Sequence, residues 1–376
     1  MNIIHIITGL NTGGAEMMLY KLLSYQDSVH IEPEVVSLTD VGPIGRRIQE
    51  IGIPVRALGM RRGVLNPFAV LKLVTWLRRS RPAVVQSWMY HSDLVGGISA
   101  KWAGGVPLVW GIRHSNLDAG INKQSTIWTA KLCARTSRWL PARIICCSEA
   151  SRQVHTSIGY APEKMVVIPN GFDLDTFRPD PGARESVYRE LGIEKDVPLI
   201  GLIGRFDPQK DHRNFVIAAA RLQAHSPDPH FLLCGDGVDN QNAELTRWIV
   251  EAGLGKRFHL LGRREDIPRL AAALDIASSS SIGEGFPNVI GEAMACGVPC
   301  VVTDVGDSAK IVGDTGHVVL PRNPEAFAAA LNELLYLSPQ ARMNLGQQAR
   351  LRIKENYSLG SIVKQYEALY SDVATA

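Results

Sequence analysis

Short runs of apolar, often β-branched residues alternate along the chain with longer segments that have the length and polarity pattern of helices. In the first half, these runs are predicted to be strands at Ile3–Thr8, Val84–Ser87, Leu108–Trp110, Ile144–Cys147 and Val166–Ile168. Helix-length segments lie between them, for example Ala15–Tyr25 and Phe68–Arg79. Apolar strands that alternate with helices are typical of a parallel sheet covered on both faces. The pattern therefore predicts an α/β fold.

The same alternation begins afresh near residue 199. Its runs are predicted to be strands at Leu199–Ile203, Phe231–Cys234, Phe258–Leu260, Ile276–Ala277, Cys300–Thr303 and His317–Leu320. The segment between the two series, residues 176–198, contains Pro179, Pro181, Gly182 and Pro198, a composition typical of a linker. We therefore expect two domains, residues 1–178 and 179–357.

Composition agrees with two cores. The chain has 376 residues, of which 45% are hydrophobic and 20% charged. Its start lacks the pattern of a signal peptide, and no run approaches the roughly 18 uncharged apolar residues of a membrane span, so any membrane contact is expected to be peripheral. The six cysteines have no paired CxxC spacing. Reduced thiols in a cytoplasmic protein are the simplest interpretation.

Charge is distributed unevenly. Residues 1–180 carry 20 basic and 13 acidic side chains, a net charge of +7, whereas residues 181–376 carry 20 and 24, a net charge of −4. Within residues 41–92, nine side chains are basic and only Glu50 is acidic. Such a surface is usually only solvated, but it also suits a phosphate-bearing partner or an anionic lipid surface.

Glycine-rich turns follow the first predicted strand of each half. The first turn contains Gly13 and Gly14 and leads into a helix, whose free amides suit a diphosphate. The second contains Arg205 and Lys210 where open α/β sheets bind ligands. Each has a plain structural alternative: the first could be a tight strand-to-helix connection, and the second could hold two surface cations.

The most specific signal is a pair of glutamates in residues 281–299. Glu284 lies in a glycine-rich turn, and Glu292 follows eight residues later in the helix that Pro287 helps to start. Amides at the start of that helix can face a phosphate or sugar hydroxyls, and the two carboxylates can accept hydrogen bonds beside them. Helix capping explains one glutamate near a helix start but not Glu284 in the preceding loop.

This ordered set of motifs resembles the retaining glycosyltransferases of family 4, bacterial polysaccharide type, whose hallmark is Glu-x7-Glu. The resemblance covers nearly the whole chain, through Gly13-Gly14-Ala15-Glu16, Ser148-Glu149, residues 168–173, Gly204-Arg205, Lys210, residues 234–237, Leu261-Gly262 and residues 284–299. It implies the GT-B architecture, two facing Rossmann-like domains with a cleft between them. It also implies that the helix at residues 358–376 packs back on the first domain.

The resemblance assigns the donor site residue by residue. Arg205 and Lys210 would hold the diphosphate of the donor, Glu284 would contact the sugar, and Glu292 would accept hydrogen bonds from the ribose. Main-chain groups complete the site at Gly13, Gly14, Gly262, Arg263, Gly285, Phe286, Pro287, Asn288 and Val289. Gly14 would face the diphosphate, and the backbone at Gly262 and Arg263 would lie beside the nucleobase.

Two histidines compete for the place beside the reacting sugar. His114, just after the strand at Leu108–Trp110, matches the family histidine, and His91 is the second choice. Lys310 stands where relatives often carry an acid. Asp173 and Asp175 imitate a DxD metal motif of another glycosyltransferase fold, and we assign them no metal.

The resemblance implies a retaining, metal-independent enzyme without a cofactor. It would transfer sugar from a nucleotide sugar, with UDP as the expected nucleotide, to a lipid-linked glycan acceptor in surface polysaccharide synthesis. A nucleotide-sugar 2-epimerase and a catalytically silent nucleotide-sugar binder are the alternatives. No nucleic-acid partner is expected.

A membrane-facing surface is expected on the first domain. The stripe Phe68, Leu71, Val74 and Leu77, with Leu73 and Trp76 beside it, is predicted to pack against the sheet, as in most amphipathic helices of such domains. The nearby arginines, Arg61, Arg62, Arg78 and Arg79, are predicted to face anionic lipid on the inner side of the cytoplasmic membrane.

Overall fold

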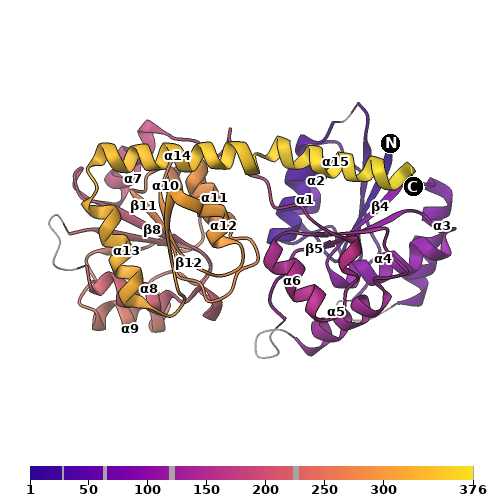
Figure 1. Ribbon diagram of the computed structural model, residues 1–376, viewed down its shortest axis with the longest axis horizontal. Coiled ribbons are helices and arrows are strands. Elements are labelled where there is room, and N and C mark those ends of the chain that lie inside the picture. Colours follow the sequence, from indigo (N-terminus) through magenta and orange to yellow (C-terminus); the bar gives the residue numbers. More distant parts are fainter. Residues whose placement is uncertain (28, 62–65, 118–122, 223–227, 376) are drawn as a thin grey trace. The chain divides into compact units, whose positions relative to one another are not determined.

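The computed structural model describes residues 1–27, 29–61, 66–117, 123–222 and 228–375. The chain divides into two compact units, which are treated separately below. Unit 1 comprises residues 1–171 and 359–376, and unit 2 comprises residues 172–358. Figure 1 shows that each unit has a central sheet with helices on both sides.

Unit 1 is built on a seven-stranded parallel sheet in the order β3-β2-β1-β4-β5-β6-β7. The strands are β1 (Asn2–Ile7), β2 (Glu32–Ser37), β3 (Val55–Ala57), β4 (Val84–Trp88), β5 (Leu108–Ile112), β6 (Arg143–Cys146) and β7 (Met165–Val167). Residues of β1, β4 and β5 are almost wholly buried. The most buried strands thus lie in the middle of the sheet.

Helices cover both faces of this sheet. They are α1 (Gly14–Tyr25), α2 (Gly42–Glu50), α3 (Pro67–Ser80), α4 (Tyr90–Trp102), α5 (Gln124–Thr136), α6 (Glu149–Ser157), the 3-10 turn η1 (Pro162–Lys164) and the C-terminal α15 (Leu359–Thr375). One core cluster joins α1, α2 and α15 to the sheet, and the other joins α3, α4 and α5 (Figure 1). The C-terminal helix is therefore part of the first core.

Unit 2 is built on a six-stranded parallel sheet in the order β10-β9-β8-β11-β12-β13. The strands are β8 (Leu199–Ile203), β9 (His230–Cys234), β10 (Phe258–Leu260), β11 (Ile276–Ser279), β12 (Cys300–Thr303) and β13 (Gly316–Val319). The prediction of an α/β fold with parallel sheets is confirmed in both units.

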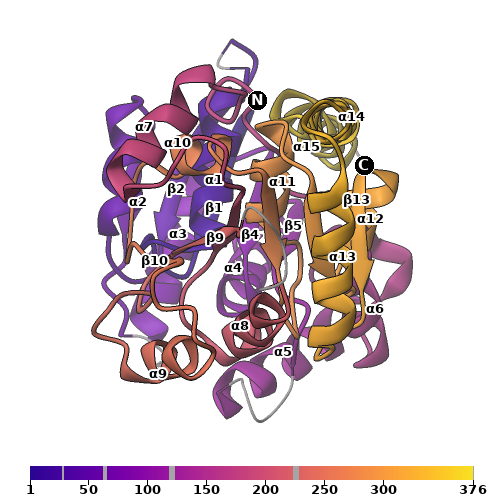
Figure 2. The same cartoon turned by 90° about the vertical axis from the view of Figure 1, so that its left-hand side faces the viewer.

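The helices of unit 2 again lie on both faces (Figure 2). They are α7 (Pro181–Leu191), α8 (His212–Ala220), α9 (Ala243–Glu251), α10 (Ile267–Ala272), α11 (Asn288–Ala295), α12 (Ser308–Val312), α13 (Pro324–Tyr336) and α14 (Pro339–Tyr357), with the 3-10 turns η2 (Pro208–Lys210) and η3 (Gly313–Thr315). A core of aromatic and aliphatic side chains joins α8, α9 and α13 to one face of the sheet.

The expected linker is wrong, because residues 181–191 form α7. Asp180 caps this helix by accepting a hydrogen bond from Gly182 N at 2.9 Å, and Pro181 occupies the first turn, where it is well tolerated. Gly192 ends the helix with φ +67. The prolines and glycines that suggested a linker are thus the start and stop signals of a helix.

The chain passes from one unit to the other seven residues earlier than the expected boundary at residue 178. Phe172 already belongs to unit 2, where its ring stacks on Phe286 at 6.0 Å and contacts Tyr357 edge-on at 6.5 Å. Gly291 must be glycine here, since a Cβ would lie 2.0 Å from the Phe172 ring. The apolar ring, not the proline content, sets the boundary.

The expected apolar stripe of α3 is partly wrong. Val74 and Leu77 are buried as predicted, but Phe68 is 82% exposed and Leu71 is 53% exposed. The face that packs on the sheet is rotated around the helix and consists of Ala69, Val70, Leu73, Val74 and Leu77. Two large apolar side chains of α3 therefore point to solvent.

Candidate functional site

Each sheet has one point where the strand order reverses, and several of the candidate residues lie beside it. In unit 2 the chain runs outward from β8 to β9 and β10, then returns to the other side of β8 with β11. The loops after β8 and β11 thus leave neighbouring strands in diverging directions. In open α/β sheets this position binds ligands.

Lys210 and Glu284, which come from these two loops, form an ion pair. Lys210 Nζ donates to Glu284 Oε1 at 2.5 Å, although the residues are 74 positions apart. Their side chains are only 20% and 12% exposed. The structure therefore brings together two residues that the sequence motifs assigned separately to the diphosphate and the sugar.

Hydrogen bonds between the two loops fix the position of Lys210. Ser280 Oγ lies 2.9 Å from Lys210 O and 3.0 Å from Asp211 O, and Ile282 N donates to Gln209 O at 2.7 Å. Asp211 has φ +46, a conformation that aspartate tolerates, and its carboxylate caps α8 through Asn214 N. The turn that carries Lys210 is thus held by the loop after β11 and by the cap of α8.

Glu284 is held by its own loop. Ser281, which is 1% exposed, donates from Oγ to Glu284 Oε1 at 2.7 Å, so this oxygen accepts two hydrogen bonds. Gly306 approaches the Glu284 backbone so closely that a Cβ would lie 2.3 Å from Glu284 O. The carboxylate is therefore preorganised without any ligand.

The helix that follows, α11, begins one residue later than Pro287, which occupies the N-cap position instead of the first turn. No side chain caps its N-terminus, and Ile290 N donates to Pro287 O at 3.2 Å. Glu292 lies half-buried in its second turn, as predicted. Phe286 and Pro287 are buried and serve to pack the loop.

The remaining donor candidates of unit 2 lie on neighbouring loops. Arg205 is 64% exposed and pairs with Asp207 at 3.0 Å, not with Glu284. Gly262 follows β10 with φ +63, and its carbonyl accepts from Gly235 N at 2.9 Å. Arg263 beside it is exposed. Gly235 in turn lies against the Gly204 backbone, so the three loops form one continuous edge.

In unit 1 the strand order reverses between β1 and β4. The turn after β1 holds Gly13, the N-cap of α1, and Gly14, while the turn after β4 leads to His91 on α4. Thr8 Oγ1 and Ser92 Oγ, 2.9 Å apart, join the two turns. A Cβ on Gly14 would meet no described atom within 4 Å, so internal packing does not require glycine there.

His114 lies after β5 and is held by α6. Its carbonyl accepts from Ser151 Oγ at 2.8 Å, and its Nδ1 accepts from Asn116 N at 3.4 Å. Burial lowers the pKa of His114 and, likewise, of His91, so both rings are neutral at pH 7. His91 Nε2 lies 3.5 Å from Thr129 Oγ1.

Comparison with protein-family models gives two matches. The model described as Glycosyltransferase Family 4 matches residues 12–176, and the model described as Glycosyl transferases group 1 matches residues 197–336. The matches include Gly13, Gly14 and the turn after β4 in unit 1, and the loops after β8 and β11 in unit 2.

The chain belongs to glycosyltransferase family 4. The glycosyltransferase is 26% identical, over 311 residues, to the UDP-Gal:alpha-D-GlcNAc-diphosphoundecaprenol alpha-1,3-galactosyltransferase of Escherichia coli, covering 81% of this chain and 79% of that one. It is 24% identical to N,N'-diacetylbacillosaminyl-diphospho-undecaprenol alpha-1,3-N-acetylgalactosaminyltransferase of Campylobacter jejuni, covering 97% and 99% of the two chains.

A solved structure of Anabaena HepE in complex with UDP superposes on the glycosyltransferase with a TM-score of 0.85. The two are 25% identical, and the match covers 99% of this chain and 100% of that chain. The predicted GT-B fold is thereby confirmed.

None of the described helices combines the length and apolarity needed to cross a bilayer. All six cysteines are buried thiols. Within the described ranges, no group of three or more His, Cys, Asp or Glu side chains could hold a metal ion. Asp173 instead closes a turn, accepting from Asp175 N and Thr176 N.

The side chains that hold the loops were not predicted from the sequence. Ser280 and Ser281 received no role, although a run of four serines after an apolar strand is an unusual pattern that marks them. Ser151 was also missed. It is an ordinary helix residue in the sequence, and only the fold shows that it holds the His114 backbone.

The ion pair leads to a prediction about Lys210. Lys210→Ala should lower the rate of sugar transfer about a hundredfold or more, because the departing diphosphate would lose a preorganised cation. The measurement is kcat with a nucleotide-sugar donor at saturation, with Lys256→Ala, an exposed lysine of unit 2, as the control. An unchanged kcat in a folded Lys210→Ala protein would leave Lys210 as a structural partner of Glu284.

Proposed function

We propose that the protein is a retaining, metal-independent glycosyltransferase that moves a sugar from a nucleotide sugar, with UDP as the nucleotide, to a lipid-linked glycan acceptor in surface polysaccharide synthesis. The contact between Lys210 and Glu284 carries the proposal. It joins a cation suited to a diphosphate with a carboxylate suited to sugar hydroxyls, where the strand order reverses.

Charge compensation explains how this site would work without a metal. As the bond between sugar and diphosphate breaks, negative charge develops on the leaving group. Lys210 and Arg205 supply positive charge, and the positive end of the α11 dipole adds to it. Glu284 keeps the Lys210 ammonium in place until the donor arrives. Glu292, in the second turn of α11, is assigned to the ribose hydroxyls.

The choice of UDP and of a lipid-linked acceptor rests on the similar proteins. The Escherichia coli relative is named for UDP-galactose and a diphosphoundecaprenol acceptor, and the Campylobacter relative for a diphospho-undecaprenol acceptor. HepE was solved with UDP. An acceptor of this kind lies in a bilayer, so the enzyme must reach a membrane surface.

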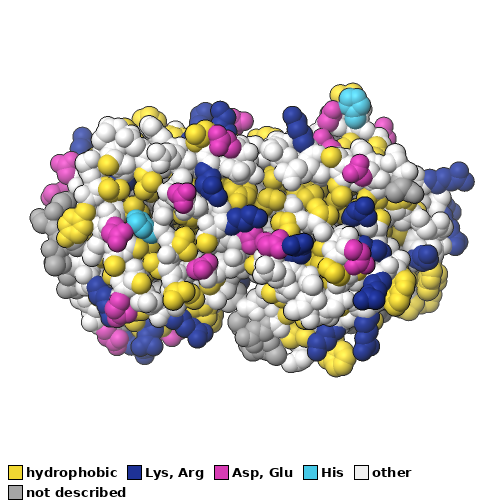
Figure 3. All heavy atoms as spheres, viewed as in Figure 1, with side chains coloured by type: hydrophobic (Ala, Val, Ile, Leu, Met, Phe, Trp, Pro, Cys, Tyr) yellow, Lys and Arg dark blue, Asp and Glu magenta, His cyan; other side chains and the backbone are white. Residues whose placement is uncertain are grey.

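The surface of unit 1 formed by α3, α5 and the end of α4 suits such contact. Three tryptophans on it, Trp102, Trp128 and Trp139, are 56%, 70% and 72% exposed. Phe68 and Leu71 of α3 are exposed as well. In Figure 3, dark blue and yellow side chains lie side by side over the part of unit 1 that α3, α4 and α5 occupy in Figure 1. Aromatic rings mixed with cations are typical of a membrane interface.

A groove of about 610 Å³ adjoins this surface. Its lining includes Arg56, Lys72 and Arg79, and the Arg56 guanidinium lies 5.1 Å from the centre of the Trp76 ring. Arg56 is paired with Glu34 at 2.5 Å, so Lys72 and Arg79 are the two lining cations suited to a phosphate headgroup. Arg78 turns away and donates to Trp102 O at 2.6 Å, and Arg62 lies outside the described residues.

The chemistry gives the first prediction of this proposal. Transfer should persist in EDTA, because Lys210 and Arg205 meet the diphosphate charge, and the product should keep the anomeric configuration of the donor. Nuclear magnetic resonance of the product formed from a UDP-sugar and a lipid-linked acceptor measures both. An inverted product, or a strict need for a divalent cation, would contradict the mechanism. Release of free sugar without an acceptor would indicate an epimerase.

The basic surface gives the second prediction. The protein should sediment with anionic vesicles at low salt and dissociate as salt rises. Replacing four cations with glutamate should lower the partition coefficient at least about a thousandfold, at about 1 kcal/mol for each lost attraction. The four residues are Arg61, Arg62, Arg78 and Arg79.

Two further variants make this test specific. Trp128→Ala should weaken binding to the same vesicles, because an exposed indole is lost. The control reverses four exposed cations of unit 2 and should bind like the wild type; its residues are Arg189, Arg213, Arg247 and Lys256. Equal affinity for neutral and anionic vesicles, or loss of binding in the control, would refute the proposed surface.

A further inference from the structure

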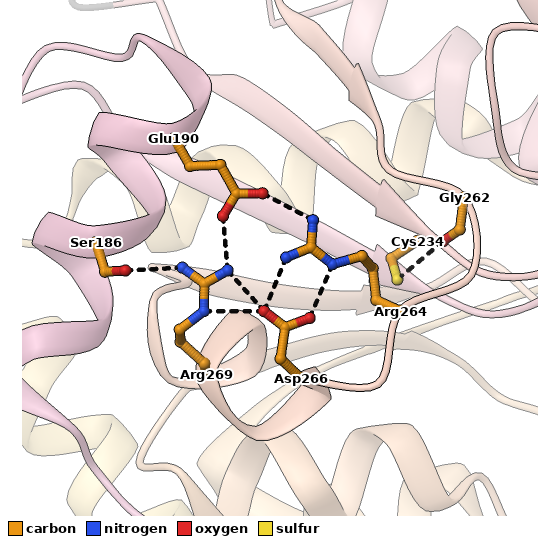
Figure 4. A network of polar contacts seen from close by, with 7 residues as sticks. All are labelled: Ser186, Glu190, Cys234, Gly262, Arg264, Asp266 and Arg269. Carbon is orange, nitrogen blue, oxygen red and sulfur yellow. Dashed lines mark hydrogen bonds and ion pairs between the residues drawn. The ribbon is translucent and has the colours of Figure 1, made fainter.

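Four charged side chains form a closed ring in unit 2, between α7 and the loop that follows β10. Two arginines and two acids alternate in it, so that each arginine contacts both acids (Figure 4). The ring consists of Glu190, Arg264, Asp266 and Arg269. Two of its members, Arg264 and Asp266, belong to the loop that also carries Gly262 and Arg263.

The contacts of the ring are short. Glu190 accepts from Arg264 Nη1 at 2.7 Å through one oxygen and from Arg269 Nη2 at 2.6 Å through the other. Arg264 binds both oxygens of Asp266 at 2.8 Å. Arg269 donates from Nη2 to Asp266 Oδ2 at 2.6 Å and from Nη1 to Ser186 Oγ at 2.9 Å. Hydrogen bonds from the arginines hold the pKa of Asp266 and of Glu190 below their usual ranges, so both acids stay ionised.

The loop after β10 is also hydrogen-bonded to residues at the end of β9 and just after it. Gly235 N and the Cys234 thiol donate to Gly262 O at 2.9 and 3.3 Å, and Gly262 N donates to Val238 O at 2.8 Å. Figure 4 shows Cys234 and Gly262 beside the ring. Burial raises the pKa of Cys234 to about 11, so the thiol remains a donor. Both ends of the short segment from Gly262 to Asp266 are thus fixed.

Half-buried and exposed residues alternate from Gly262 to Asp266, and Arg263 is one of the exposed residues. Arg264 and Asp266 belong to the ring, whereas the alternate residues Arg263 and Glu265 are exposed. Arg263 forms no ion pair with any described residue, whereas the charges of Arg264 and Asp266 are neutralised within the ring. The Arg263 cation and the fixed Gly262 backbone therefore lie in the segment that is assigned to the nucleobase of the donor.

We propose that the ring of Glu190, Arg264, Asp266 and Arg269 positions the segment Gly262–Arg263 to read the base of the nucleotide donor, and so sets which nucleotide the enzyme accepts. This inference rests on the proposed donor site of unit 2. The four residues are positioning residues, since they act through the segment and not on the ligand. Their side chains are 27–35% exposed, and the ring joins α7, α10 and the loop after β10, so it fixes where that loop lies.

The test compares two glutamates of α7. Glu190→Gln replaces one acceptor oxygen by an NH2 group, which faces an arginine donor of the ring. Glu185→Gln removes an exposed ion pair with Arg189 outside the ring. Isothermal titration calorimetry of the full chain with UDP, GDP and ADP should show that the wild type prefers one of them. In Glu190→Gln, affinity for that nucleotide should fall about tenfold, while affinity for the other two changes less than twofold.

Kinetics separate positioning from general damage. With the preferred donor, Glu190→Gln should raise KM about tenfold and leave kcat within twofold, and Glu185→Gln should match the wild type. Arg264→Lys keeps the charge but lacks the planar fork, so it should lose selectivity in the same way and serves if Glu190→Gln does not fold.

The outcomes distinguish this inference from the proposed function. A wild type that binds none of the nucleotides overturns the proposed donor site, and the inference with it. A wild type that binds one nucleotide preferentially, with variants that either match it or lose affinity equally for all three, overturns the inference and leaves the donor site intact. Loss confined to the preferred nucleotide supports the role of the ring.

Discussion

Parallel strands need helices on both faces, and this requirement determines where the chain has room for chemistry. Because α-helices cover the faces of each sheet, ligand-binding loops are confined to the carboxyl ends of the strands. At the point where the strand order reverses, two neighbouring loops diverge. In unit 2 these loops carry Lys210 and Glu284, and in unit 1 they lead into helices that begin with Gly14 and with Tyr90-His91. The candidate residues therefore follow from the topology, although they are far apart in the sequence.

The apolar strands were the part of the fold that the sequence predicted best. The expected bounds of β8, β10 and β12 agree with the structure to the residue, because these strands are short, apolar and bounded by turns. The strands β2 and β3 were missed. Glu32, Pro33 and Glu34 begin the first, and Arg56 is the middle of the second, so neither presents an apolar run. The edge strand is β3, and in β2 only the second half is buried.

Helix signals were harder to interpret than strand signals. Proline and glycine suggested a linker at residues 176–198, yet Pro181 and Gly192 begin and end α7. In α3 the spacing of large apolar residues suggested one stripe, whereas small Ala69 and Val70 lie on the buried face and Phe68 is exposed. Residue spacing alone does not distinguish a side chain that packs on a sheet from one that is left to contact another surface.

Polar contacts between distant residues were beyond the reach of sequence patterns. The Glu-x7-Glu motif pointed to Glu284 and Glu292, and the resemblance to family 4 supplied their roles. Nothing in the local sequence indicates that Ser281 would share an oxygen of Glu284 with Lys210, or that Glu190 would meet Arg264, 74 residues later. Such contacts depend on which loops the sheet order makes neighbours, and that order is a property of the whole unit.

A crystal structure of the protein with UDP tests the central claim most directly, that the loops after β8 and β11 form the donor site. The account predicts that the diphosphate lies within hydrogen-bond distance of Lys210 Nζ, that the ribose hydroxyls donate to Glu292, and that the uracil lies along Gly262 and Arg263. A diphosphate bound away from Lys210, for example among Arg56, Lys72 and Arg79 of unit 1, would contradict it.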